Sequence, residues 1–331
     1  MVSNWEYNEY DKSASDALDA FLPAAIFDVH AHLYRVSDLN IQRTGLLGEG
    51  PEEVGVAAWR EHAGRQIGLH RLTGGLFFPM PTPACNIDRA NDFLFCQLAM
   101  AENCRGLILV SPKDSPEKVA KDLGRDQVAG FKPYHVFSGA GDSFQSEITS
   151  YLPEWVWQMA DGRGAVIMLH LVRDKALMDP GNQKVIQRMC SRYPGVKLVL
   201  AHAGRGFNGL NTVYGVDALR ELTNIWFDTS GICESAALKA IIKAFGPRRL
   251  MWGSDFPISE IRGRCVSIGD GFIWLQNDTV VWDKISPACH PILVGLESLR
   301  AVNEAAEDLR LSKKDLQDIF CSNALNLLGV G

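Results

Sequence analysis

Several features are missing from this sequence, and each absence excludes a class of protein. No stretch reaches the roughly 18 uninterrupted apolar residues of a transmembrane helix, and the N-terminal MVSNWEYNEYDKSASD has no apolar signal-peptide core. Basic residues are not in excess, since 33 Lys and Arg against 39 Asp and Glu leave a net charge of −6, which argues against nucleic-acid binding. The eight cysteines form no C-x-x-C pair, as is typical of reduced thiols. We therefore expect a cytoplasmic protein with neither a membrane nor a nucleic-acid partner.

The sequence instead contains a recurring pattern of short apolar runs separated by amphipathic segments. Several runs, such as VKLVLAH, are almost continuously apolar, as expected for parallel strands that helices cover. No Gly-rich dinucleotide fingerprint follows the first run, so an α/β fold of the (β/α)8 TIM-barrel type is favoured over an open doubly wound sheet. The predicted strands are Ala25–His32, Gly75–Pro79, Gly106–Val110, Ala129–Tyr134, Ala165–Leu171, Lys197–Ala203, Asn224–Thr229 and Arg249–Asp255.

The remaining segments are assigned to one domain spanning residues 1–331, with no linker or internal repeat. Residues 1–20 are predicted to be an N-terminal extension, and residues 258–290 a loop insertion over the active face. Two C-terminal helices are predicted to close the chain, near Pro291–Leu309 and Ser312–Leu328. The predicted helices between the strands are Pro51–Leu69, Asp88–Glu102, Ser115–Leu123, Pro153–Asp161, Gln183–Tyr193, Val213–Glu221 and Glu234–Phe245.

Ionisable side chains stand at the ends of four predicted core strands. His30 and His32 end the first strand and share one face of it, because residues two apart in a strand point the same way. His170 ends the fifth strand, His202 the sixth and Asp255 the eighth. Burying these groups without partners would cost roughly a few kcal/mol each, and a shared metal ion would remove that cost. Imidazoles with one carboxylate suit a zinc-like divalent ion that keeps a position for water or substrate.

These motifs resemble the amidohydrolase superfamily, and more narrowly the amidohydrolase-related group that includes aminocarboxymuconate semialdehyde decarboxylase, resorcylate decarboxylases and several lactone or ester hydrolases. The likeness rests on H-x-H, the two later histidines and GSDFP, and FDTSG and DIFCSNALNLLG extend it over nearly the whole chain. The resemblance implies that His30, His32, His170 and Asp255 hold one divalent ion, zinc before manganese or another metal. It also implies that His202 is the acid/base and that Asp255 accepts the proton of the attacking water.

Four further residues have predicted roles near this site. Lys132 ends the fourth strand. In binuclear members of the superfamily a lysine there is carboxylated and bridges two metals, whereas in mononuclear relatives it is an ordinary cation; we favour one metal, with Lys132 near the substrate. Tyr34 and His135 are candidate substrate contacts, although each is equally compatible with packing or a loop position. Asp28 is predicted to orient a histidine by accepting a hydrogen bond.

The expected substrate is a small anion. Three neutral imidazoles, one carboxylate and a divalent cation leave the site at about +1, and Arg205 follows His202 into the same loop. Arg173 occupies a similar place after His170, where a surface ion pair is the favoured interpretation.

Two chemistries use the same residues. The sequence slightly favours a hydrolase that acts on a lactone, ester or amide, and the alternative is a decarboxylase of an unsaturated or aromatic carboxylate. A non-catalytic metal-binding protein is the remote third hypothesis. Members of the group are often homodimers, which makes a homodimer the assembly to test.

Overall fold

The eight predicted parallel strands are all present in the structure, a computed structural model that describes residues 3–330. They lie in one curled sheet of order β2-β1-β3-β4-β5-β6-β7-β8-β9, in which β1 and β3 to β9 pair in parallel and β2 pairs antiparallel with β1. The strands are β1 Ile26–Arg35, β2 Glu53–Val54, β3 Leu72–Pro79, β4 Cys104–Val110, β5 Val128–Pro133, β6 Val166–Leu169, β7 Lys197–Leu200, β8 Ile225–Asp228 and β9 Leu250–Met251.

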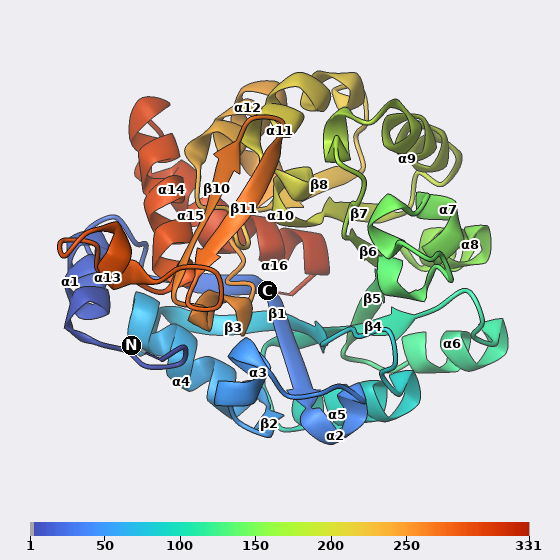
Figure 1. The fold of residues 1–331 in the computed structure, drawn as a ribbon. Coiled ribbons are helices and arrows are strands. Elements are labelled where there is room, and N and C mark those ends of the chain that lie inside the picture. Colours follow the sequence, from blue (N-terminus) through green and yellow to red (C-terminus); the bar gives the residue numbers. More distant parts are fainter. Residues whose placement is uncertain (1–2, 331) are drawn as a thin grey trace.

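The first and last strands of the parallel sheet, β1 and β9, come together. The amide of Val29 in β1 donates to the carbonyl of Trp252 just after β9 at 3.2 Å, and the amide of Asp255 donates to the carbonyl of His30 at 2.8 Å. Figure 1 shows the resulting ring of strands with helices around it, the arrangement of a TIM barrel. All parallel strands therefore direct their carboxyl ends to one rim, where the predicted site residues lie.

Several helices, among them α6, α9 and α11, begin where a side chain caps the free backbone amides. Ser115 and Asp179 each accept a hydrogen bond from an amide in the first turn, and each is followed by the proline that favours a helix start. The helix predicted at 213–221 begins earlier, at Gly209, because Asn208 caps it there. The helices are α1 Glu9–Leu18, α2 Val36–Leu39, α3 Gly45–Glu49, α4 Val56–Ile67, α5 Ile87–Ala99, α6 Pro116–Leu123, α7 Ile148–Tyr151, α8 Glu154–Arg163, α9 Pro180–Arg192, α10 Ala201–Arg205, α11 Gly209–Gly215, α12 Ser235–Phe245, α13 Trp282–Ile285, α14 Val294–Asp308, α15 Lys313–Gln317 and α16 Asn323–Leu328.

The C-terminal segment covers the end of the barrel opposite to the rim. A π-helical turn, Asp318–Ser322, joins α15 to α16. Lys197, the first residue of β7, donates to the carbonyl of Leu327 at 2.6 Å, and Asn323 donates to the carbonyl of Leu250, the first residue of β9. Because both contacts are made at strand starts, this segment leaves the rim free.

The stretch 258–290, predicted as a loop insertion, contains a β-hairpin. Strands β10 Gly263–Ile268 and β11 Gly271–Gln276 pair antiparallel around a turn at Gly269 and Asp270, and Gly269 adopts a φ of +55° that favours glycine. Figure 1 shows the hairpin in orange beside α14. The alternation of side chains around the Gly-Asp-Gly turn was the signal for it in the sequence. Among residues 3–330, no helix has both the length and the apolar composition for a membrane crossing.

Candidate active site

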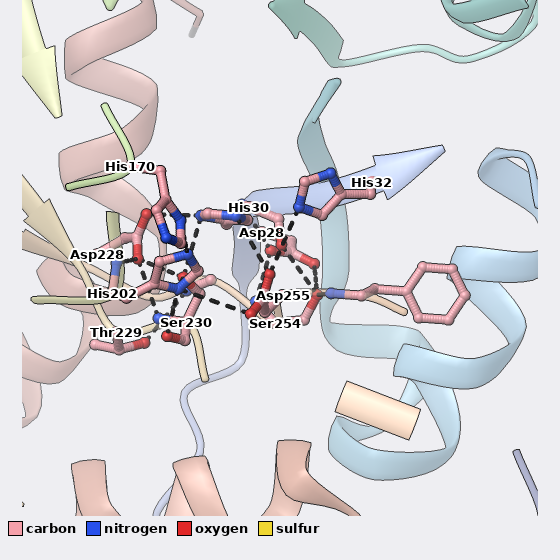
Figure 2. A network of polar contacts seen from close by, with 12 residues as sticks. Asp28, His30, His32, His170, His202, Asp228, Thr229, Ser230, Ser254 and Asp255 are labelled. Atoms are coloured by element: carbon pink, nitrogen blue, oxygen red, sulfur yellow. Dashed lines mark hydrogen bonds and ion pairs between the residues drawn. The ribbon is translucent and has the colours of Figure 1, made fainter. Parts of the chain in front are cut away.

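The predicted metal ligands and the predicted acid/base lie at the carboxyl ends of the barrel strands, and all of them are buried. His30 and His32 belong to β1, His170 directly follows β6, His202 lies two residues after β7, and Asp255 lies four residues after β9. The strand-end positions read from the sequence therefore place these residues on one rim. Figure 2 shows the site with His30, His202 and Asp255 turned toward one another.

Three of these residues present ligand atoms to a common point. His30 Nε2 lies 3.3 Å from Asp255 Oδ1, and His32 Nε2 lies 3.7 Å from the same oxygen. One nitrogen or oxygen atom from each of the three residues lies within 4.8 Å of the other two. In residues 3–330, His30 Nε2 is one of two buried side-chain nitrogens or oxygens that have no hydrogen-bond partner. Such an atom is costly to bury, and a bound cation would satisfy it.

His170 lies farther from Asp255 than the other histidines of the site, on the far side of the His202 imidazole. Its Nδ1 is 3.1 Å from His202 Nε2 and 3.4 Å from the hydroxyl of Tyr134, so its polar contacts are with the acid/base rather than with Asp255. The three-residue group of His30, His32 and Asp255 does not include it. Metal ligation by His170 therefore stays a prediction.

Asp228 holds two of the histidines in place, and the sequence analysis assigned it no role. Its Oδ2 accepts a hydrogen bond from His30 Nδ1 at 2.9 Å, which leaves the lone pair of His30 on Nε2, the atom that faces Asp255. Its Oδ1 accepts from the backbone amide of His202 at 2.8 Å and from the hydroxyl of Ser230 at 2.5 Å. His202 Nδ1 in turn lies 3.0 Å from the carbonyl of Ser230, to which it can donate. Asp228 thus holds the ring of His30 directly and the backbone of His202, and it reaches the His202 ring only through Ser230.

The expected role of Asp28 needs correction, because its carboxylate contacts no histidine ring. It accepts hydrogen bonds from the backbone amides of His30 at 3.0 Å and Ser254 at 2.9 Å, and from the indole of Trp59 at 2.8 Å. Burial raises its pKa to about 6, although these hydrogen bonds and that from the Ser254 hydroxyl oppose the shift. Asp28 therefore joins the backbone of β1 to the segment before Asp255, and Asp228 orients the ring.

Burial sets the charge states of the site. It lowers the pKa of His30, His32 and His170 far below the usual range, and it lowers that of His202 to about 4, so the imidazoles are neutral near pH 7. Burial also raises the pKa of Asp255, as does the nearby Asp228. Neutral imidazoles are the form that binds metals, and a cation would stabilise the ionised Asp255. The donor set therefore fits a divalent metal ion.

Lys132 is the second buried group without a hydrogen-bond partner among residues 3–330. Its ammonium lies 4.3 Å from the centre of the Phe78 ring, and burial lowers its pKa to about 8 even though Asp228 and Asp255 favour the charged form. The side chain lies beneath the site and is not among the residues lining the open cavity described next. Its predicted substrate contact has no support in this geometry.

A cavity of about 690 Å³ opens above the histidines, within the range of small-molecule sites. His32, His170, His202 and Asp255 form its base. Its wall includes His135, whose Nδ1 lies 3.0 Å from the hydroxyl of Ser143 and whose ring lies 5.4 Å from that of His170. His135 is thus a cavity residue rather than a remote loop histidine.

Arg205 also lines the cavity, whereas Tyr34 and Arg173 do not. Among residues 3–330, no carboxylate lies within 4.0 Å of the Arg205 guanidinium, which donates to the carbonyl of Leu171 at 3.2 Å. Arg173 forms the expected ion pairs, with Glu147 and Asp179. Tyr34 is buried at the point where β1 continues past the rim to pair with β2, so its predicted substrate contact has no support here.

The backbone is strained at three of these residues. His202, Arg205 and Asp255 have φ values of +54°, +60° and +60°, a conformation that side chains other than glycine rarely adopt. Strain of this kind persists where surrounding contacts impose it, commonly at functional sites. The backbone amides of His202 and Asp255 are held in this conformation by hydrogen bonds to Asp228 and to the carbonyl of His30.

Comparison with known proteins shows the family to which the chain belongs. The amidohydrolase family model matches residues 27–330. The chain belongs to the amidohydrolase family. Among curated proteins, it is similar to L-fucono-1,5-lactonase of Burkholderia ambifaria, with 26% identity over 127 residues. That match covers 34% of this chain and 43% of the lactonase, so the chain spans less than half the length of this relative.

Solved amidohydrolase structures share the fold at low identity. A zinc-bound amidohydrolase of Burkholderia multivorans has a TM-score of 0.60 at 17% identity, covering 93% of this chain and 100% of that one. A putative 2-pyrone-4,6-dicarboxylic acid hydrolase of Pseudomonas putida has a TM-score of 0.58 at 19% identity, covering 93% and 99%. A manganese-bound dihydroxybenzoic acid decarboxylase of Polaromonas sp. JS666 has a TM-score of 0.52 at 15% identity, covering 93% and 98%. These likenesses show the fold, and the similar structures include both a hydrolase and a decarboxylase, so the comparisons favour neither reaction.

Proposed function

We propose that this amidohydrolase is a metal-dependent hydrolase that acts on a small carboxylate-bearing lactone, ester or amide. The observation that carries the proposal is the buried, unpartnered Nε2 of His30, 3.3 Å from Asp255 and below an open cavity. His30, His32, His170 and Asp255 are the proposed ligands of one ion. A divalent ion there would supply Lewis acidity, which polarises a carbonyl and makes water more acidic.

The residues of the chain then have separate tasks. Asp255 accepts the proton of the attacking water on a carboxylate oxygen. The proton that Asp255 takes up passes on through His202, whose Nδ1 lies 3.7 Å from Asp255 Oδ2, to the leaving oxygen or nitrogen, so His202 is neutral before and after the step. Asp228 keeps His30 and His202 in their orientations through its two oxygens. Arg205 binds the carboxylate of the substrate, because it lines the cavity without an acidic partner within 4.0 Å among residues 3–330.

One observation favours the alternative, a decarboxylase. His135 lies in the cavity wall next to His170, just after β5, and its position in the sequence resembles that of a histidine in the decarboxylases of this family. There it could bind the carboxylate that leaves as carbon dioxide, with His202 supplying the replacing proton. A non-catalytic metal-binding protein remains the third hypothesis, and the cavity beside His202 argues against it.

Zinc is the proposed ion, because imidazole nitrogens with one carboxylate suit it well, and manganese is the second choice. We also propose one domain over residues 1–331, closed by two C-terminal helices, with residues 1–20 as an extension and residues 258–290 as the insertion over the active face. The buried ion pair of Asp11 with Arg262, at 2.8 Å, supports the attachment of that extension. A cytoplasmic location rests on eight free cysteines, and a homodimer stays a prediction.

A substrate panel tests the proposal. Metal-free protein is reconstituted with zinc or manganese and assayed against lactones, esters and amides with a free carboxylate, and against aromatic carboxylates. We expect metal-dependent hydrolysis of at least one carboxylate-bearing member. Release of carbon dioxide without hydrolysis would select the decarboxylase, and metal binding with no turnover across the panel would contradict both.

A further inference from the structure

The β10–β11 hairpin presents one face to the cavity and the other to solvent. Side chains directly opposite each other in an antiparallel pair share a face, and here Phe272 pairs with Ser267 and Trp274 with Cys265. Phe272 and Trp274 line the cavity, and Cys265 is buried. Ile273, between the two aromatic residues, is 40% exposed, as expected of the opposite face.

The inward face continues an aromatic row that begins at the proposed acid/base. The Phe207 ring stacks on His202 with ring centres 5.2 Å apart. The same ring lies 5.1 Å from Phe272 and 5.5 Å from Trp274. Phe207 is tilted by 45° to Phe272 and by 64° to Trp274, and aromatic rings at these separations and angles attract one another, so together they make an aromatic wall that starts at His202.

Side-chain hydrogen bonds fasten the hairpin to the barrel loops. Asn208, next to Phe207, donates to the carbonyls of Gly269 and Gly271 at 2.9 and 2.7 Å, on either side of the hairpin turn. The hydroxyl of Ser267 bonds to Glu234, which precedes α12. The wall is therefore held against the site at its turn, so that Phe272 and Trp274 are fixed relative to His202.

The wall also meets the proposed carboxylate-binding residue. The Arg205 guanidinium lies 5.6 Å from the centre of the Phe272 ring and 5.2 Å from that of Phe144. Both separations allow a cation–π contact, which fixes the guanidinium while leaving its remaining donors to a ligand. An anion-binding group and an aromatic surface thus lie side by side in the cavity above the histidines.

We propose that Phe272 and Trp274 are specificity-determining residues that select substrates with a flat apolar group next to the carboxylate held by Arg205. The proposal rests on the proposed function, since it assumes that a carboxylate binds at Arg205. A substrate with a carboxylate and no such group would leave the aromatic wall exposed to water and would bind less tightly.

Binding rather than turnover tests this, with benzoate and acetate as probes. Calorimetric titration of the metal-loaded protein compares the wild type with Phe272→Ala, Trp274→Ala and Trp274→Leu, and with Ile273→Ala as the matched control on the outer face. Wild type is expected to bind benzoate at least about tenfold more tightly than acetate. Trp274→Ala and Phe272→Ala should each lose most of that preference while acetate affinity stays within about twofold, and Ile273→Ala should match wild type.

The outcomes separate the hypotheses. An unchanged ratio of benzoate to acetate affinity in Trp274→Ala would overturn the proposal, and so would an equal weakening of both ligands, which indicates a structural role. If Trp274→Ala lowers the unfolding temperature strongly, the ratio of benzoate to acetate affinity is measured in Trp274→Leu instead. This variant keeps an apolar side chain but removes the flat ring. A substrate panel without turnover would remove the proposed hydrolase activity and leave this binding result standing.

Discussion

The base and the wall of the cavity are built in different ways. The base consists of His32, His170, His202 and Asp255, with His30 next to them, and these residues stand in barrel strands or within four residues after them and are buried. The wall consists of side chains on loops and the hairpin, such as Trp274, and most of these are partly exposed. A rigid base can hold a metal and move protons, whereas a wall on connecting segments can vary without disturbing the barrel. The comparison therefore assigns the chemistry to the base and the choice of substrate to the wall.

Removing the acid/base should have the largest effect on turnover while sparing metal binding. We expect His202→Ala to lower kcat by about 10²- to 10⁴-fold, the usual contribution of a positioned acid or base. Metal content should match wild type, because His202 is not one of the proposed ligands, and the second group that it forms with His30 and Asp228 is held by hydrogen bonds. The exposed His70→Ala is the control and should be fully active. Retained activity in the His202 variant would show that the acid/base is misassigned.

Within the base, Asp228 should act through the histidines that it holds. Asp228→Asn keeps the size of the side chain but lacks the two charged acceptors that bind His30 and His202. Metal affinity, measured by competition with a chelator, should fall about 10- to 100-fold, as is typical when a ligand's partner is lost. Asp217→Asn, a change in an exposed ion pair, should leave it unchanged. Wild-type affinity in Asp228→Asn would mean that this carboxylate only supports the fold.

In the wall, Arg205 should affect anionic ligands alone. Arg205→Ala removes a charge-assisted hydrogen bond worth roughly 1.5 to 3 kcal/mol, which corresponds to about a 10- to 100-fold loss of kcat/KM for a carboxylate substrate. The neutral ester or amide of the same substrate should be nearly unaffected. Arg173→Ala is the matched control, because Arg173 is already paired with Glu147 and Asp179. Equal losses for charged and neutral ligands would make Arg205 a structural residue.

The smallest expected effect is a pH dependence of stability caused by protonation of His135. Burial lowers its pKa to about 4, with Arg205 adding to the shift, so the folded protein keeps this ring neutral between pH 6.5 and 4 while the unfolded chain protonates it. The free energy of unfolding should therefore fall as the pH drops through that window, by at most about 1.4 kcal/mol per pH unit for one proton. In metal-free His135→Asn, measured by urea unfolding, the fall should be shallower than in wild type. Identical slopes would rule out this contribution.

The sequence predicts the base better than the wall for a physical reason. A strand that ends in a parallel barrel fixes the position of its last residues, so His30, His32, His202 and Asp255 could be placed together from their strand ends alone. Asp228 is the last residue of β8, so its strand-end position also points to the site. In the sequence, its FDTSG motif contributes only to the family resemblance. The wall depends on contacts between segments distant in the chain, such as Asn208 with Gly269, and no local pattern encodes these.

Tyr34 and Asp28 show where a prediction from strand-end position fails. Tyr34 shares a strand face with His30 and His32, but β1 continues past the rim to pair with β2, which carries Tyr34 away from the cavity. Asp28 lies within the same strand, and its side chain binds backbone amides instead of a ring. Alternation along a strand predicts the face to which a side chain points. The group that the side chain contacts depends on the tertiary fold.

The central claim is that His30, His32 and Asp255, with His170 as the fourth proposed ligand, hold one divalent ion, and metal stoichiometry tests it most directly. Elemental analysis of zinc- or manganese-reconstituted protein should give about one ion per chain in wild type, and none above background in His30→Ala and Asp255→Ala. Mass spectrometry under native conditions should find Lys132 unmodified, and Lys132→Ala should still bind one ion. Wild-type metal content in the His30 and Asp255 variants would contradict the claim, and two ions with a carboxylated Lys132 would replace the single-ion site with a binuclear one.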